Sequence, residues 1–142
     1  MKKLVFMFFA STLLISCVSG ESKPLQLNSD SCDFCRMTIT NGQFGAELIT
    51  QKGRCYKFDD VFCMVQFAKS NTSVNYQSYF VCDYLMNNKL ISVEKCIYLK
   101  GDSIKSPMNG NAIAFSSKKD ALHYQSKYNA VILTWKELYS SY

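Results

Sequence analysis

Three sulfur-bearing side chains stand within six residues of one another, at Cys32, Cys35 and Met37. Thiolates and thioethers select soft metal ions such as Cu(I), whereas magnesium and calcium sites gather carboxylate and carbonyl oxygens. The segment around these residues contains sulfur in place of a carboxylate cluster. The spacing therefore indicates a Cu(I)-binding site.

A fourth sulfur donor is expected from Met108. If residues around the cysteine pair are extended, the side chains of Cys35 and Met37 point to the same side, and Cys32 folds back to join them. The fixed φ of Pro107 holds Met108 in an extended loop, from which its thioether would complete a site of three or four sulfurs. Such mixed ligation suits a protein that passes copper on, because a neutral thioether is displaced more easily than a thiolate.

Two other kinds of site use paired cysteines. A thioredoxin-type redox pair normally caps a helix, which lowers the thiol pKa, but residues 38–42 favour strand and turn. A structural zinc site needs four ligands, and the sequence has one closely spaced pair. No base stands near Cys32 or Cys35, so we expect a protein that is not an enzyme. A thiol-disulfide redox protein stays open as an alternative, and zinc stays open as a second metal.

The other polar and sulfur-bearing candidates are expected to be structural. His123 falls on a predicted helix and is expected at its surface. Asp30 and Asp33 flank the cysteine pair, where either could accept hydrogen bonds in an outer shell around a metal or be a harder ligand for a second metal. Free cysteine packs as a small hydrophobe. We therefore expect core positions, with the disulfide state left open, for Cys55, Cys63, Cys82 and Cys96.

The N-terminus has the features of an exported lipoprotein. A basic start is followed by an apolar run from Leu4 to Leu14, which is shorter than the roughly 20 residues that span a bilayer. Leu14-Ile15-Ser16-Cys17 is similar to a bacterial lipobox. We therefore predict a signal peptide over residues 1–16 and a lipid on Cys17, which would anchor the protein to the cell membrane or outer membrane on the periplasmic side.

The rest of the sequence indicates one domain that follows a flexible stalk. Residues 17–28 are expected to form a flexible stalk, and residues 29–142 are of single-domain length. The net charge is +5, of which the signal peptide contributes two charges. The lysines are scattered along the sequence, so no nucleic-acid partner is expected.

Two successive ββαβ units are expected within an α+β domain. The first has strands over 44–50 and 53–58, a helix over 61–69 capped by Asp59 or Asp60, and a strand over 79–84. The second unit is expected to follow residue 90. Its strands are predicted over 90–99, 112–115 and 131–135, with a helix after Ser117. We match Phe44–Ile49 to Gly110–Phe115, which makes Met37 and Met108 equivalent.

These motifs carry a resemblance to a known family. Cys32-x-x-Cys35-x-Met37, followed by the segment from Ser106 to Phe115, resembles the NosL family of nitrous oxide reductase accessory lipoproteins over nearly the whole mature chain. The resemblance implies two ββαβ halves similar to the alkylmercury lyase fold. It also implies a Cu(I) chaperone for nitrous oxide reductase, with the membrane-bound assembly and transport machinery of that enzyme as partner; general copper buffering is the alternative. The residues that it implicates are the metal ligands Cys32, Cys35, Met37 and Met108 and the lipid site Cys17.

Overall fold

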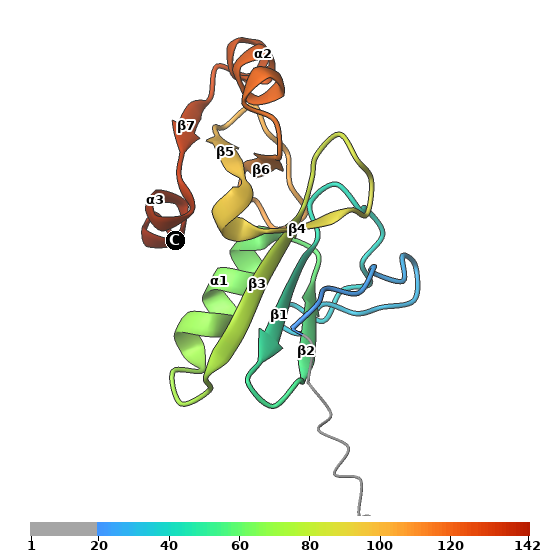
Figure 1. The fold of residues 1–142 in the computed structure, drawn as a ribbon. Helices are drawn as coiled ribbons and strands as arrows, with labels where there is room; N and C mark the ends of the chain where they lie inside the picture. The colour runs from blue at the N-terminus through green and yellow to red at the C-terminus, as the bar shows by residue number, and fades with distance from the viewer. Residues whose placement is uncertain (1–19) are drawn as a thin grey trace, which may run out of the picture.

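The computed structural model describes residues 20–142, which form two antiparallel sheets (Figure 1). One sheet has the strand order β2-β1-β3-β4 and the other has the order β6-β5-β7. A parallel bridge between Asp83 and Ala114 links them. The strands are β1 (Ala46–Thr50), β2 (Cys55–Phe58), β3 (Tyr76–Cys82), β4 (Leu90–Ser92), β5 (Ile97–Lys100), β6 (Ala112–Phe115) and β7 (Val131–Leu133).

Three α-helices cover the two sheets. Helix α1 (Val61–Ser70) packs against β1 and β2, whereas α2 (Lys118–Tyr128) and α3 (Trp135–Ser140) pack against the second sheet. A single 3-10 turn, η1 (Val93–Lys95), separates β4 from β5. Within residues 20–142, no helix combines the length and the apolar character needed to cross a membrane.

The two halves share one topology. In each half the first strand is central, the second and third strands flank it, and a helix connects the flanking strands. The predicted pair of ββαβ units and the α+β class are confirmed. The predicted alignment of the halves is wrong, because β1 is the first strand of its half and β6 is the second strand of its own. The break at η1, inside the segment predicted as one strand over 90–99, concealed that β5 is the equivalent of β1.

Side-chain caps begin all three α-helices. Asp60 caps α1 by accepting a hydrogen bond from the backbone N–H of Phe62, and Ser117 caps α2 as predicted. Thr134 and Glu137 form a reciprocal capping box at the start of α3. That helix is missing from the sequence prediction, because its cap lies at the end of the predicted strand over 131–135.

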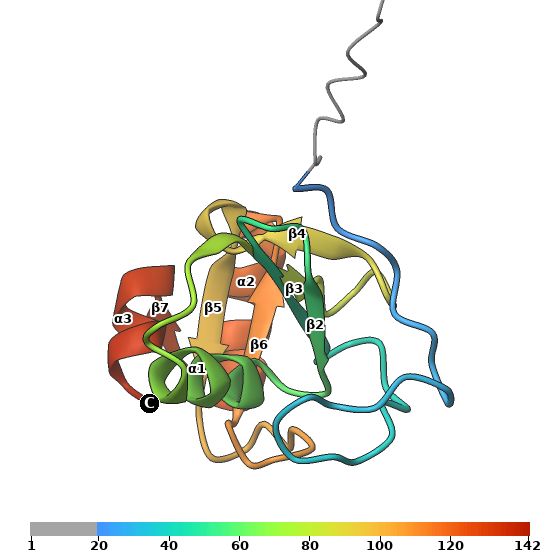
Figure 2. The same cartoon turned by 90° about the horizontal axis from the view of Figure 1, so that it is seen from below.

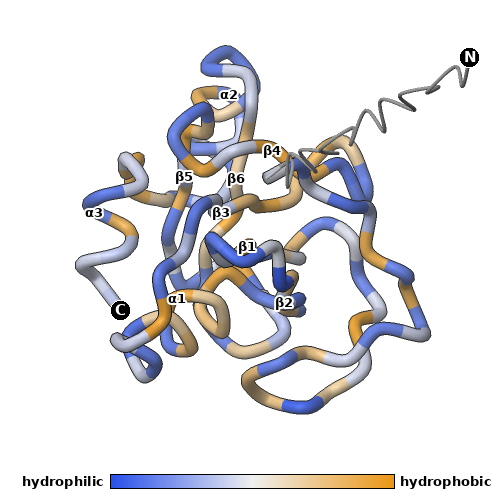
Figure 3. The backbone as a smooth tube through the Cα atoms, turned by 60° about the horizontal axis from the view of Figure 1, so that its bottom comes forward, coloured by the Kyte–Doolittle hydropathy of each residue, from blue (hydrophilic) through white to orange (hydrophobic). Residues whose placement is uncertain are grey.

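The segment before the cysteine pair is packed against the first sheet. Leu25 is buried, and its backbone pairs with the side chain of Asn88 at 3.0 and 2.7 Å. The backbone N–H of Lys23 donates to the buried Glu47. The stalk predicted over 17–28 is therefore wrong at its C-terminal end, where packing begins well before residue 29. Hydrophobic and hydrophilic residues alternate along this segment (Figure 3), but it is too short for the alternation to predict regular structure.

A buried carboxylate holds the two sheets together. One oxygen of Asp83 accepts hydrogen bonds from the backbone N–H and hydroxyl of Ser116, at 2.8 and 2.6 Å. Its other oxygen accepts from the backbone N–H groups of Leu85 and Met86. Burial alone would raise the pKa of Asp83, but the donors from Ser116, Leu85 and Met86 outweigh it and hold the pKa below its usual value.

We expect the carboxylate of Asp83 to contribute stability that is lost in acid. Because its folded pKa is depressed, the contribution is full above the unfolded pKa of about 3.9 and disappears as the pH falls through the folded value. Asp83→Asn should lower the free energy of unfolding by about 2 kcal/mol at pH 7 and flatten its decline below about pH 4. Urea unfolding at pH 7 and pH 3 measures both effects. Equal declines in the two proteins would contradict this role.

Candidate metal centre

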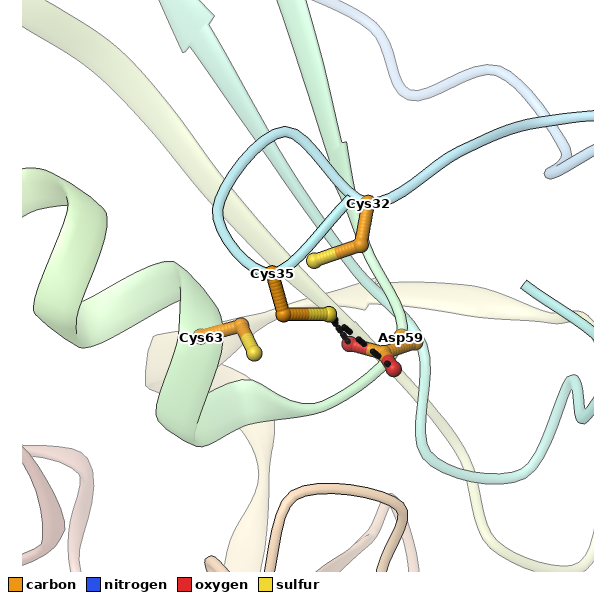
Figure 4. Close-up of side chains that lie close together, drawn as sticks. All are labelled: Cys32, Cys35, Asp59 and Cys63. Atoms are coloured by element: carbon orange, nitrogen blue, oxygen red, sulfur yellow. Dashed lines mark hydrogen bonds between the residues drawn. The ribbon is translucent and has the colours of Figure 1, made fainter. Parts of the chain in front are cut away.

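Four side chains that are far apart in the sequence converge at the start of helix α1. The Sγ atoms of Cys32, Cys35 and Cys63 and a carboxylate oxygen of Asp59 all lie within 4.8 Å of one another. Figure 4 shows the two cysteines of the loop facing Cys63 on α1 and Asp59 just before it. Cys35 donates to the carboxylate, with Sγ to oxygen distances of 3.5 and 3.6 Å. This group is the candidate metal centre of the described chain.

The first two cysteines lie in a tight loop closed by backbone hydrogen bonds. Ser31 and Thr38 form an isolated antiparallel bridge at its base, and the N–H of Cys32 donates to the carbonyl of Met37 at 2.8 Å. Within the loop, the N–H of Arg36 donates to the carbonyl of Cys32 at 3.0 Å. Arg36 has a φ of 69°, in the left-handed region. The loop is therefore a turn, and the extended backbone that we predicted for this stretch is wrong.

Acidic residues fasten this loop to the edge strand β2. The N–H of Asp33 donates to the carbonyl of Lys57 at 2.8 Å, and the N–H of Lys57 donates to the Asp33 carboxylate at 2.8 Å. The ammonium group of Lys57 forms an ion pair with Asp30 at 2.6 Å. Asp30 and Asp33, for which an outer-shell role or binding of a second metal was left open, thus bind β2 in this structure. Asp59 follows Lys57 by two residues, so this docking brings the cysteine pair to it.

Cys63 joins the group from the first turn of α1. Its side chain is fully buried, as the prediction of a core position required. The sequence interpretation nevertheless did not place it at the metal site, because 27 residues separate it from Cys35 and only the docking of the loop on β2 brings them together. The sequence feature that could have placed Cys63 at the site was its position three residues after the helix cap Asp60. The other three described cysteines with core predictions lie outside the cluster and are free thiols: Cys55, Cys82 and Cys96.

The pKa values of the three cysteines are shifted in different directions. The neighbouring Cys63 thiol favours the Cys32 thiolate; burial opposes it, and the backbone N–H groups of Cys35, Asp59 and Phe34 add support, so the pKa of Cys32 falls to about 6. Burial raises the pKa of Cys35 to about 11. The pKa of Cys63 is also raised, first by its interaction with Cys32 and then by burial. Cys32 therefore has the lowest pKa of the three cysteines.

One side of the centre reaches the surface. Cys32 and Cys63 are fully buried and Asp59 nearly so, whereas Cys35 is partly exposed. Met37, on the same loop, is 45% exposed. An ion held by the three sulfurs would therefore be approached from the side of Cys35.

The predicted donor Met108 arrives from the second half of the fold. It is half-buried, and its backbone N–H donates to Asp60, the neighbour of Asp59, at 3.0 Å. Figure 2 shows the loop between β5 and β6 beside the start of α1. His123 lies exposed on α2, where its ring packs edge-on against Tyr124, in agreement with the predicted surface position.

The donor set fits a soft metal ion. Cu(I) selects cysteine sulfur in its thiolate form, so the thiols of the cluster must lose their protons when an ion binds. The Asp59 oxygen would also allow a closed tetrahedral site with three sulfurs and one oxygen, which zinc accepts. The donor types therefore favour Cu(I) or Zn(II), both of which bind cysteine sulfur.

Comparisons with known proteins bear on the family and the fold. The NosL family profile matches residues 24–142. The crystal structure of the copper chaperone NosL from Shewanella denitrificans is similar with a TM-score of 0.70 and 19% sequence identity, covering 82% of this chain and 94% of that chain. At this identity the likeness establishes the fold. A search of curated proteins gave no match.

Proposed function

Because the chain belongs to the NosL family, as its motifs indicated, we propose that it is a copper chaperone that binds Cu(I) at the thiol cluster. The observation that carries the proposal is the convergence of three Sγ atoms on one point at the start of α1. The copper ion is cargo in this proposal. The ligands of the copper ion are exchanged when it is passed on, and no covalent bond in a substrate is made or broken.

The exposure of the donors suggests how copper could be passed on. Cys32 and Cys63 would hold the ion from the buried side, while the partly exposed Cys35 and the exposed Met37 stand where a partner's ligand can approach. A partner could displace the outer ligands first and the buried thiolates last. Met37 and Met108 are retained as thioether ligands in this proposal, because a neutral thioether binds the ion less tightly than a further thiolate would and is displaced more easily by a partner's ligand.

We also propose a location and a client. The lipobox that ends at Cys17 lies outside the described residues, and it supports a lipid anchor on the periplasmic side of a membrane. Family membership supports delivery to nitrous oxide reductase through its membrane-bound assembly machinery. General copper buffering is the alternative, and it would need the same site without a dedicated acceptor.

A competition titration tests the proposal. The reduced protein is titrated with Cu(I) against a chromogenic Cu(I) chelator, and we expect one ion per chain. Met37→Leu and Met108→Leu should each weaken binding by about tenfold, since each removes one sulfur but keeps the size of the side chain. A thiol-disulfide protein would instead show the same Cu(I) affinity in both variants.

Zinc is the second candidate cargo, on the observation that an Asp59 oxygen accompanies the three sulfurs. The affinities for Zn(II) and for Cu(I) should respond differently to Asp59→Asn. Loss of the carboxylate charge should reduce Zn(II) affinity sharply, but should change Cu(I) affinity little because the sulfurs are kept. If Zn(II) displaced stoichiometric Cu(I) from the wild-type protein, the copper proposal would be wrong.

A further inference from the structure

A second acidic residue, Asp60, joins the two halves of the fold beside the thiol cluster. Its carboxylate is fully buried. One oxygen accepts from the backbone N–H of Phe62 at 2.9 Å, which is the cap of α1. The other oxygen accepts from the Ser106 hydroxyl at 2.6 Å and from the N–H groups of Met108 and Gly110 at 3.0 and 3.4 Å.

A helix cap needs only the first of these contacts. Capping uses one side-chain oxygen and one or two N–H groups at the start of the helix. The second oxygen of Asp60 instead takes its three donors from the loop between β5 and β6, at least 46 residues away along the chain. The residue therefore fixes a loop of the other half against the helix that carries Cys63.

The loop is shaped to receive this carboxylate. Ser106 also accepts from the N–H of Asn111 at 2.9 Å, and the Tyr142 hydroxyl donates to the carbonyl of Gly110 at 2.7 Å. A Cβ atom at Gly110 would lie 2.6 Å from Cβ of Phe62 and 2.7 Å from the Asp60 carboxylate. Only glycine allows so close an approach of the loop to α1.

We propose that Asp60, together with Ser106, is a positioning residue that holds the loop of Met108 beside the thiol cluster so that the Met108 thioether can bind the ion. This rests on the proposed function. Asp60 follows Asp59 directly and precedes Cys63 by three residues, so one side chain sets both the start of α1 and the backbone position of Met108. Groups that orient metal ligands in this way typically contribute a 10- to 100-fold difference in affinity.

A double-mutant cycle tests the proposal. Ser106→Ala removes the hydroxyl donor but keeps Asp60 as the cap of α1. In the protein with Met108, we expect this change to weaken Cu(I) binding by about tenfold. In the Met108→Leu background it should cause no further loss, because the thioether that it positions is already absent. Equal losses in both backgrounds, or no loss in either, would overturn the proposal.

Ser116→Ala is the matched control. Its hydroxyl donates to the buried Asp83 at 2.6 Å, the same distance as in the Ser106–Asp60 pair, and it lies outside the thiol cluster. Both serine variants should lose similar stability in urea, and only Ser106→Ala should lose affinity for Cu(I). If Ser116→Ala lost as much affinity, the effect would be one of general destabilisation and the positioning role would be refuted.

A spectroscopic measurement separates positioning from folding and from the proposed function. With 13C-methyl methionine, the Met108 methyl signal should shift when Cu(I) binds to the wild-type protein. In Ser106→Ala the Met108 shift should shrink strongly, while the Met37 signal still responds. An unchanged Met108 shift in the variant would exclude the positioning role. If the wild-type protein bound no Cu(I) at all, the proposed function itself would be wrong.

Discussion

Replacing Cys32 with serine is expected to reduce Cu(I) affinity by more than about 100-fold, which exceeds the range typical of residues that only orient ligands. Cys32 is the fully buried cysteine of the cluster whose pKa is lowered, and a hydroxyl is a hard, poorly ionised substitute for its sulfur. Cys63→Ser should lower the affinity by at least about tenfold. The chelator competition assay measures both variants under reducing conditions.

Cys96→Ser is the control for these substitutions. Cys96 is also buried, but its Sγ donates to the carbonyl of Ser92 and lies outside the cluster. A serine hydroxyl can donate to the same carbonyl, so this variant should bind Cu(I) as the wild type does. If Cys63→Ser also bound normally, the site would consist of the cysteine pair and thioethers, and the third thiol would only fill the core.

Loading with Cu(I) is expected to stabilise the protein strongly. At a free Cu(I) concentration about 1,000 times the Kd, binding to the folded state adds about 4 kcal/mol to the free energy of unfolding. For a domain of this size that corresponds to a rise in Tm of at least about 10 °C. The rise should be large because the loop that carries Cys32 and Cys35 and the residue Cys63 in α1 would then be bound to one ion.

Thermal unfolding followed by circular dichroism, with Cu(I) buffered by a chelator, measures the rise. Cys32→Ser should show little or none of it, whereas Cys96→Ser should show all of it. An equal rise in Tm for both variants would mean that copper binds elsewhere on the folded chain.

Local sequence signals were sufficient for most of the fold. The spacing of Val61, Met64 and Val65 and the cap before them predicted α1 within one residue. Apolar and β-branched residues predicted strands over 44–50 and 79–84, which the structure places at Ala46–Thr50 and Tyr76–Cys82. The signals failed where two elements meet without a glycine, proline or asparagine to mark the turn. The turn η1 joins β4 to β5 through Val93, Glu94 and Lys95, so one strand was predicted across two sheets.

Of the four residues in the metal centre, only the cysteine pair was predicted from the sequence. The pair of cysteines has a spacing that suggests metal binding by itself, but Cys63 and Asp59 are brought there by the docking of Asp33 on Lys57. Such a long-range contact leaves no periodic trace in a single sequence. The prediction that Met37 shares a strand face with Cys35 was also wrong, because Arg36 adopts a left-handed backbone that sequence periodicity does not reveal.

Anomalous diffraction at the copper edge from crystals of the Cu(I)-loaded protein tests the central claim most directly. Our account predicts one copper peak at the start of α1, within bonding distance of the Sγ atoms of Cys32, Cys35 and Cys63. A peak at another place, such as His123, or a copper ion that contacts none of these sulfurs, would contradict it.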